Sequence, residues 1–252
     1  MGVSWRFLQM VDQARLSLSL RVLRAFKRRE DLLPALQNLC ERYGLSHISF
    51  LVVHSGGNAG PYPYYCTTYP DTWTQIYVDK RYFDIDPVIH VVRSELLPVD
   101  WSALDRQPRK VQNFFREARS YGIGPHGLTI PIRGRNGERS LFSVASDLPK
   151  REWARLRASS IHELHILSHY FHEAALSASG LREDDRYRTL SGREGQCLQL
   201  LAKGRISKQI AADLGISQNA VKLYLRSARL KLGAATSHQA VGRATFLELI
   251  EI

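Results

Sequence analysis

The sequence predicts two domains of different class. The first is an α/β domain, an α-β-α sandwich with a mainly antiparallel sheet, and the second is an all-α four-helix helix-turn-helix domain. Three observations lead to this prediction. Segments that alternate like strands lie among amphipathic helices before residue 178. Asn136-Gly137 separates two such segments and is a strong hairpin signal. Residues 190–250 carry helical patterns alone, with a turn at Gly215.

The length and composition of the chain suit this division. Its 252 residues exceed what the second module needs, and 44% of them are hydrophobic, which allows a substantial core. Residues 179–189 are polar and charged. We therefore expect a first domain at 1–178, a linker at 179–189 and a second domain at 190–252.

The first domain is expected to run helix, strands, helices, strands, helix. Gly44 and Gly122 each end an amphipathic helix. Ser55 to Pro61 is a loop that lacks the lysine of a phosphate-binding loop, so nucleotide binding is not expected. The expected elements are helices at 5–27 and 31–43, strands at 48–53 and 64–69, helices near 71–80, 87–93 and 108–121, strands at 128–132 and 140–145, and a long helix at 150–177.

The second domain has clear helix starts and a clear turn. Ser191 and Glu194 form an S-x-x-E capping box at the start of its first helix. Ala211 is small where two helices cross, Gly215 suits the tight turn between them, and Ser217 can cap the helix that follows. This spacing is typical of a helix-turn-helix. A last helix is expected to begin with Ser237 as its cap.

The helix after the turn has two faces at helical spacing. The inward face carries Val221, Leu225, Ala228 and Leu232, and the opposite face carries Asn219, Lys222, Arg226 and Arg229. In a recognition helix, Lys and Arg reach guanine edges and phosphates, while Asn pairs with adenine. An ordinary solvated basic face is the alternative, and the preceding glycine turn favours DNA recognition.

Composition sets further limits on function. The formal net charge is +11 and the pI is about 9.8, which favours an anionic partner and salt-sensitive binding. The three cysteines are scattered and lack zinc spacing, so we expect no metal and a reducing cytoplasm. The N-terminus does not resemble a signal peptide, and no apolar run approaches 18 residues, so no membrane partner is expected.

Residues 69–101 are rich in large side chains that also form hydrogen bonds. These are Tyr69, Trp73, Tyr77, Asp86 and Trp101. Trp73 and Tyr77 are four residues apart and share a helix face. From the residues alone, the simpler interpretation is that the aromatic residues fill the core and that Asp86, before a proline, is a helix N-cap.

Both halves of the chain resemble LuxR-type transcription factors. The C-terminal half matches that family's pattern at Glu194, Leu198, Gly204, Val221 and Lys222. The N-terminal half matches the family's lactone-binding motif, in order, at Trp73, Tyr77, Asp86, Trp101, Gly127 and Thr129, with Tyr69 and Ser143 at further family positions. Gln209 stands where the family usually has Glu.

The resemblance implies a ligand-responsive regulator of quorum sensing. The implied ligand is an acyl-homoserine lactone or a related homoserine lactone, with no cofactor. Trp73 would donate to the ring carbonyl, Asp86 would accept from the amide N–H, and the hydroxyls of Tyr69 and Ser143 would donate to the amide carbonyl. The residues implied to bind ligand are Tyr69, Trp73, Tyr77, Asp86, Trp101, Thr129 and Ser143.

The implied partners are double-stranded DNA with a palindromic promoter site, a second copy of the chain, and RNA polymerase as a further candidate for an activator. The residues implied to bind DNA are Ser217, Gln218, Asn219, Lys222, Arg226 and Arg229.

Two alternative functions remain. The first is a regulator of the same architecture that responds to a different small molecule or to none. The second is an enzyme, which the absence of G-x-S-x-G, H-E-x-x-H and C-x-x-C motifs disfavours.

A histidine row marks the long helix at 150–177. His162, His165, His169 and His172 recur at spacings of 3, 4 and 3 residues and are expected to lie along one stripe. The simplest interpretation is four solvated side chains at an exposed edge. The functional alternative is a dimer seam whose histidines become charged as the pH falls. Metal binding is disfavoured because no cysteine or acidic partner accompanies the row.

Overall fold

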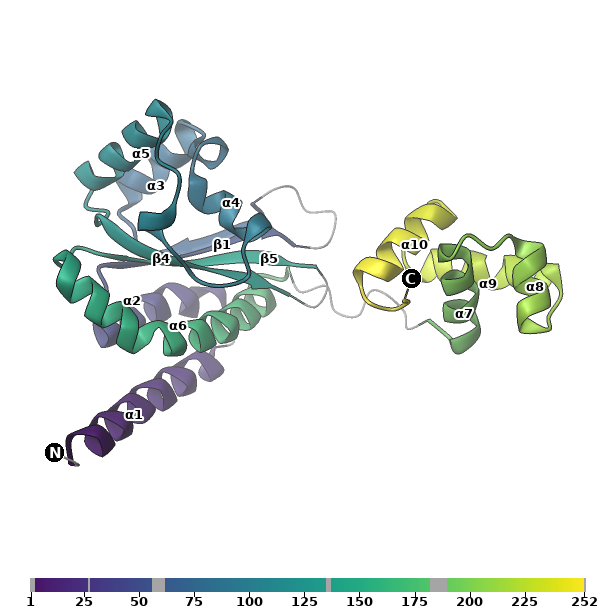
Figure 1. Cartoon of the computed structure of the whole chain (residues 1–252), viewed down its shortest axis with the longest axis horizontal. Helices are drawn as coiled ribbons and strands as arrows, with labels where there is room; N and C mark the ends of the chain where they lie inside the picture. Colours follow the sequence, from purple (N-terminus) through teal and green to yellow (C-terminus); the bar gives the residue numbers. More distant parts are fainter. Residues whose placement is uncertain (1–2, 27, 56–61, 135–136, 182–189, 252) are drawn as a thin grey trace. The chain divides into compact units, whose positions relative to one another are not determined.

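The computed structural model describes residues 3–26, 28–55, 62–134, 137–181 and 190–251, and for residues 3–13 the backbone alone. Within these residues the chain forms two compact units, one before and one after residue 182 (Figure 1). Residues 56–61 of the expected loop at 55–61 and most of the expected linker lie outside the described residues, as does Asn136. Over the described part of the chain, no helix combines the length and apolar character needed to cross a bilayer.

The first unit is built on a five-stranded antiparallel sheet of order β2-β1-β5-β4-β3. The strands are β1 (His47–His54), β2 (Tyr64–Thr67), β3 (Val99–Asp100), β4 (His126–Arg133) and β5 (Arg139–Ser146). The β4–β5 hairpin is present as predicted. The short strand β3 was not predicted, because two residues cannot display an alternating pattern.

Helices cover both faces of this sheet, which confirms the predicted α-β-α sandwich (Figure 1). One face carries α2 (Leu32–Tyr43) and α6 (Lys150–Ala178), and α1 (Val3–Ala25) packs on α6. The other face carries α3 (Asp71–Asp79), α4 (Pro87–Ser94) and α5 (Arg109–Ser120). Three short 3₁₀ turns complete the unit, η1 (Arg29–Asp31), η2 (Tyr82–Asp84) and η3 (Trp101–Ala103).

The alternation along β1 shows why these layers form. Ile48, Phe50 and Val52 are fully buried in the core beneath α2 and α6. Ser49 and Leu51 have the opposite parity and face the α3–α5 layer, because successive side chains of a strand point to opposite faces. The apolar side joins the hydrophobic core, and the mixed side lines a pocket.

The histidine row on α6 differs from the prediction of four solvated side chains. His162 and His169 are exposed and His165 is half-buried, but His172 is buried beside Phe50, and its Nδ1 lies 3.1 Å from Ser140 Oγ. The helix therefore turns His172 into the core, and the interpretation of four solvated histidines was wrong for this residue. Partial desolvation of the His169 ring, with His165 close by, lowers the pKa of this otherwise exposed side chain.

The second unit consists of α7 (Gly192–Ala202), α8 (Ser207–Leu214), α9 (Gln218–Lys231) and α10 (Ser237–Phe246). Gly215 adopts a left-handed φ of 64° between α8 and α9, as the turn requires. Ser217 Oγ accepts from Ala220 N at 3.1 Å and caps α9 as predicted. The cap of α10 was misplaced by one residue, because Thr236, and not Ser237, accepts from Gln239 N.

Candidate ligand pocket and helix-turn-helix surface

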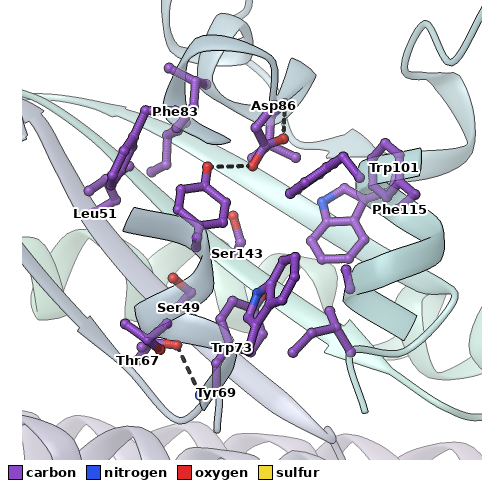
Figure 2. Close-up of a pocket in the computed structure, with 18 of the residues that line it drawn as sticks. Ser49, Leu51, Thr67, Tyr69, Trp73, Phe83, Asp86, Trp101, Phe115 and Ser143 are labelled. Atoms are coloured by element: carbon purple, nitrogen blue, oxygen red, sulfur yellow. Dashed lines mark hydrogen bonds between the residues drawn. The ribbon is translucent and has the colours of Figure 1, made fainter. Parts of the chain in front are cut away.

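A pocket lies between the sheet and the layer formed by α3, α4 and α5 (Figure 2). Its walls are mainly aromatic and aliphatic, and its polar groups are few. Such a composition is typical of small-molecule sites, where apolar walls supply contact area and a few polar groups fix orientation. Six of the seven predicted ligand residues line it, namely Tyr69, Trp73, Tyr77, Asp86, Trp101 and Ser143.

Asp86 both caps a helix and faces this pocket. Its Oδ1 accepts from Val88 N at 2.9 Å at the start of α4, so the predicted N-cap is present. Its Oδ2 accepts from the Tyr77 hydroxyl at 2.8 Å. Burial raises the pKa of Asp86 to about 6, although these two hydrogen bonds act in the opposite direction. A carboxylate offers about four acceptor positions, so two remain for a ligand N–H.

Trp73 supplies a buried donor on the adjacent wall. Its ring is 2% exposed and lies among Tyr77, Tyr82, Phe114 and Tyr121, with centroid separations of 5.7 to 6.0 Å. Within the described residues its indole N–H has no hydrogen-bond acceptor. An indole nitrogen can only donate, so Trp73 is suited to a carbonyl oxygen of a ligand.

Trp101, Thr129 and Ser143 form a chain of hydrogen bonds. Trp101 Nε1 donates to Thr129 Oγ1 at 2.8 Å, and Thr129 Oγ1 lies 2.9 Å from Ser143 Oγ. Because Thr129 accepts from the indole, its own proton is available for Ser143. The Ser143 hydroxyl is then free to donate into the pocket. Thr129 is fully buried behind the wall, so the structure gives it a positioning role.

Gly127 explains how Trp101 reaches this chain. A Cβ built on Gly127 would lie 2.4 to 2.5 Å from carbon atoms of the Trp101 indole, well inside contact distance. The indole therefore packs directly on the backbone of β4. This close approach, and not a positive φ, accounts for glycine at the position.

Tyr69 and Tyr77 complete the predicted set in different ways. Burial raises the pKa of both tyrosines, and nearby Asp86 adds to the effect, so both hydroxyls stay protonated as donors. The proton of Tyr77 is used by Asp86. The Tyr69 hydroxyl makes no hydrogen bond within the described part of the chain, so it is available for a ligand.

Several pocket residues were not predicted from the sequence. They are Ser49, Leu51, Phe83, Arg106, Phe114 and Phe115, among others. Phe114 and Phe115 lie on the apolar face of α5, where a sequence pattern predicts burial but not whether the partner is core or ligand. Ser49 lies in a predicted strand, and the alternation along β1 puts it on the face opposite Ile48 and Phe50, but alternation gives no hint of a cavity there.

In the second unit, Glu194 joins α7 to α9. It accepts from Ser191 N at 2.6 Å, Ser227 Oγ at 2.7 Å and Lys231 Nζ at 2.7 Å. Burial alone would raise its pKa, but these hydrogen bonds hold the pKa of Glu194 at about 2. The predicted capping box is therefore also a buried ionic link between two helices.

The predicted DNA-facing side chains of α9 lie mostly in solvent. Ser217, Gln218, Asn219, Lys222 and Arg226 are exposed. Arg229 is half-buried, and its guanidinium donates to the Ala235 carbonyl at 2.5 Å in the turn after α9. In α8, Gln209 Oε1 accepts from Ile206 N at 3.0 Å, so the side chain at the third helical position satisfies the backbone N–H of the residue before the helix.

Comparison with known proteins gives matches to both units. Residues 28–175 match the autoinducer binding domain, and residues 188–244 match the bacterial regulatory proteins of the luxR family. The transcriptional activator RaiR of Rhizobium etli is 45% identical over 177 residues, which cover 70% of this chain and 73% of RaiR. The transcriptional activator AhyR of Aeromonas hydrophila is 31% identical over 180 residues, 69% of this chain and 68% of AhyR.

A solved structure shows the same fold. The crystal structure of Escherichia coli SdiA aligns with a TM-score of 0.70 at 20% identity, over 95% of this chain and 99% of SdiA. At that identity the likeness establishes the architecture, with a sheet domain followed by a helix-turn-helix domain.

Proposed function

The chain belongs to the LuxR family of bacterial transcription regulators, and from that premise we propose that it is a quorum-sensing activator controlled by an acyl-homoserine lactone. Membership confirms the family predicted from the sequence and the prediction that the chain is not an enzyme. Members carry an autoinducer-binding domain and a DNA-binding domain, and both are present here. The lactone, the palindromic site and the dimer are the proposed steps beyond this.

One observation carries the choice of ligand. Within a mostly apolar pocket, the donor and acceptor positions that the described protein groups leave open match the polar atoms of an acyl-homoserine lactone. Trp73 offers a donor for the ring carbonyl, Asp86 offers acceptor positions for the amide N–H, and Ser143 offers a donor for the amide carbonyl. A ligand that covers the Trp73 indole without an acceptor would leave its N–H buried and unpaired, at a cost of about 1–3 kcal/mol.

The DNA step is supported by the exposed polar face of α9. Lys222 and Arg226 are one turn apart and exposed, on the side opposite the buried Val221 and Leu225. A dimer would place two such helices in successive major grooves, about 34 Å apart, which requires a palindromic site. The names of RaiR and AhyR as transcriptional activators support activation as the direction of control.

Ligand capture tests this proposal. The protein is expressed beside lactone synthases of different acyl specificity, purified, and extracted for mass analysis. We expect one homoserine lactone to be retained at close to one molecule per chain, with less retained by Trp73→Phe, which keeps an aromatic ring but loses the N–H. Retention of a different class of molecule, or equal retention by Trp73→Phe, would contradict the assignment.

A further inference from the structure

A row of four hydroxyl side chains crosses the sheet on the side of the pocket. The strand register places Thr67 opposite Ser49, Ser49 opposite Ser143, and Ser143 opposite Thr129. Directly opposed residues of antiparallel strands share one face, with their Cβ atoms about 4.5–5.5 Å apart. Thr67, Ser49 and Ser143 all line the pocket, and Figure 2 shows the Ser49 and Ser143 hydroxyls directed into it.

Two members of the row are satisfied by the protein itself. Thr67 Oγ1 donates to the Ile48 carbonyl at 3.3 Å and accepts from Tyr69 N at 3.0 Å. Thr129 accepts from Trp101 and lies within hydrogen-bond distance of Ser143. The threonines therefore have their own partners and need nothing from a ligand.

Ser49 differs from its neighbours in the row. Its hydroxyl makes no hydrogen bond to any described residue, and its side chain is half-buried at the pocket wall beside Leu51. A ligand chain of CH₂ groups lying over Ser49 would remove water from the hydroxyl and leave it unpaired, which disfavours such a ligand. A ligand with an oxygen at this point would pair with it.

The spacing of the row indicates where that oxygen lies. If Ser143 donates to the amide carbonyl, Ser49 is the next hydroxyl along the row, one strand spacing of about 4.8 Å away. With C–C bonds of ~1.5 Å, an oxygen on the β-carbon of the acyl chain is held ~3–5 Å from the carbonyl oxygen. An oxygen on the α-carbon lies closer to the carbonyl oxygen than this spacing.

We propose that the pocket selects acyl-homoserine lactones that carry a hydroxyl or keto oxygen on the acyl β-carbon, and that Ser49 reads this oxygen. The inference rests on the proposed lactone ligand and adds the class of acyl chain. Ser143 holds the carbonyl that all acyl-homoserine lactones share, and Ser49 distinguishes the substituted chains from the plain ones.

A mutant cycle between the protein and the ligand tests this inference. Dissociation constants of the full chain are measured for lactones of one chain length with a β-hydroxyl, a β-keto group or neither. The proteins are the wild type, Ser49→Ala, and Ser143→Ala as the matched control on the neighbouring strand. Thermal unfolding of each variant without ligand checks that the fold is kept.

The expected pattern is specific to Ser49. The wild type should bind at least one β-oxygenated lactone roughly three- to tenfold more tightly than the plain one, the worth of one neutral hydrogen bond. Ser49→Ala should remove this preference and bind the plain lactone at least as well as the wild type. Ser143→Ala should weaken the three ligands alike.

Two results would overturn the inference while leaving the proposed function intact. One is a wild type that binds the plain lactone as well as both substituted ones. The other is a Ser49→Ala variant that keeps the full preference. If no homoserine lactone binds the wild type at all, the proposed function fails, and the inference fails with it.

Discussion

Asp86 both caps a helix and lines the pocket. Its two oxygens accept from Val88 N and from the Tyr77 hydroxyl, so it begins α4 and fixes a tyrosine of α3. The N-cap interpretation and the ligand interpretation of this residue are therefore compatible. Replacement by alanine would disturb both roles, whereas asparagine keeps one carbonyl oxygen as a possible cap and removes the charge.

The raised pKa of Asp86 predicts a pH dependence. Burial raises its pKa from 3.8 to about 6 in the folded protein. The stability linked to this proton is therefore present at low pH and is lost as the pH rises through about 6. A ligand N–H favours the ionised carboxylate, so lactone binding should change in the opposite sense and strengthen with rising pH. We expect about tenfold weaker binding at pH 5 than at pH 7.

Titration calorimetry of the wild type and Asp86→Asn at both pH values measures this effect. The asparagine variant should bind more weakly than the wild type at pH 7 and show little change between the two values. The same tenfold change in Asp86→Asn would assign the pH dependence to another group.

The pocket residues differ in how far the sequence could predict them. Trp73, Tyr77 and Asp86 follow the spacing of the family motif, so the resemblance predicted that they lie together. Thr129 shared that pattern, yet it lies behind the wall, because the spacing does not show whether a strand residue meets the ligand or supports one that does. Ser49 belongs to no recognised motif, and its place beside Ser143 in the pocket wall depends on the pairing of β1 with β5.

At the scale of elements, Glu194 holds the helix-turn-helix unit together. Its hydrogen bonds from Ser191, Ser227 and Lys231 join the start of α7 to the last turns of α9. The packing of α9 against α7 thus includes a charged group that is only 5% exposed. Removal of the charge would leave the half-buried Lys231 ammonium without this carboxylate partner.

We predict that Glu194→Gln lowers the free energy of unfolding of the second unit by roughly 2 kcal/mol at pH 7, the worth of a hydrogen bond to a charged group. The folded pKa of about 2 lies below the ordinary value of 4.5, so this stability is present above pH 4.5 and is lost as the pH falls toward 2. Urea unfolding at pH 7 and pH 3 measures both effects.

Asp213→Asn is the control for that experiment. Asp213 pairs with Arg205 at 3.8 Å, and both side chains are exposed, so its loss should cost at most ~0.5 kcal/mol. Equal effects of the two substitutions would mean that Glu194 makes no special contribution.

The exposed face of α9 leads to a prediction about DNA recognition. If Arg226 pairs with a guanine edge, Arg226→Ala should cost ~1–3 kcal/mol per half-site and relax the preference at one base position. Lys222→Ala is tested beside it, one turn away. Affinities for a selected site and for each single-base variant, at two salt concentrations, give the answer.

Arg229→Ala provides the comparison. The Arg229 guanidinium donates to the Ala235 carbonyl, so its removal should lower the affinity for all DNA sequences by a similar factor. Unchanged base preference in both Arg226→Ala and Lys222→Ala would mean that the reading residues lie elsewhere on the unit.

The long periodic helices and the strands of the hairpin were predicted to within a few residues, because their patterns extend over several turns or pleats. The starts and ends of elements were less certain. Strand β2 ends at Thr67, two residues before the predicted end, and α10 is capped one residue earlier than predicted. These details depend on single hydrogen bonds, which hydrophobic periodicity does not report.

For the molecule as a whole, the proposed function joins a ligand pocket in the first unit to DNA recognition in the second. A ligand that binds only the folded state stabilises it by about 4 kcal/mol at a thousandfold excess over its Kd. We propose that this stabilisation favours the dimer, and that the dimer binds the palindromic site. The architecture was predictable because both units carry strong motifs, whereas the acyl chain depends on the shape of one pocket.

The central claim is that lactone binding controls DNA binding, and the most direct test is the affinity of the full chain for DNA with and without lactone. A palindromic site selected with the liganded protein is compared with a single half-site, for the wild type and Asp86→Asn. We predict that lactone strengthens wild-type binding to the palindrome at least tenfold, strengthens half-site binding much less, and has little effect on Asp86→Asn. Equal affinity of the wild type for the palindrome with and without lactone would contradict this claim.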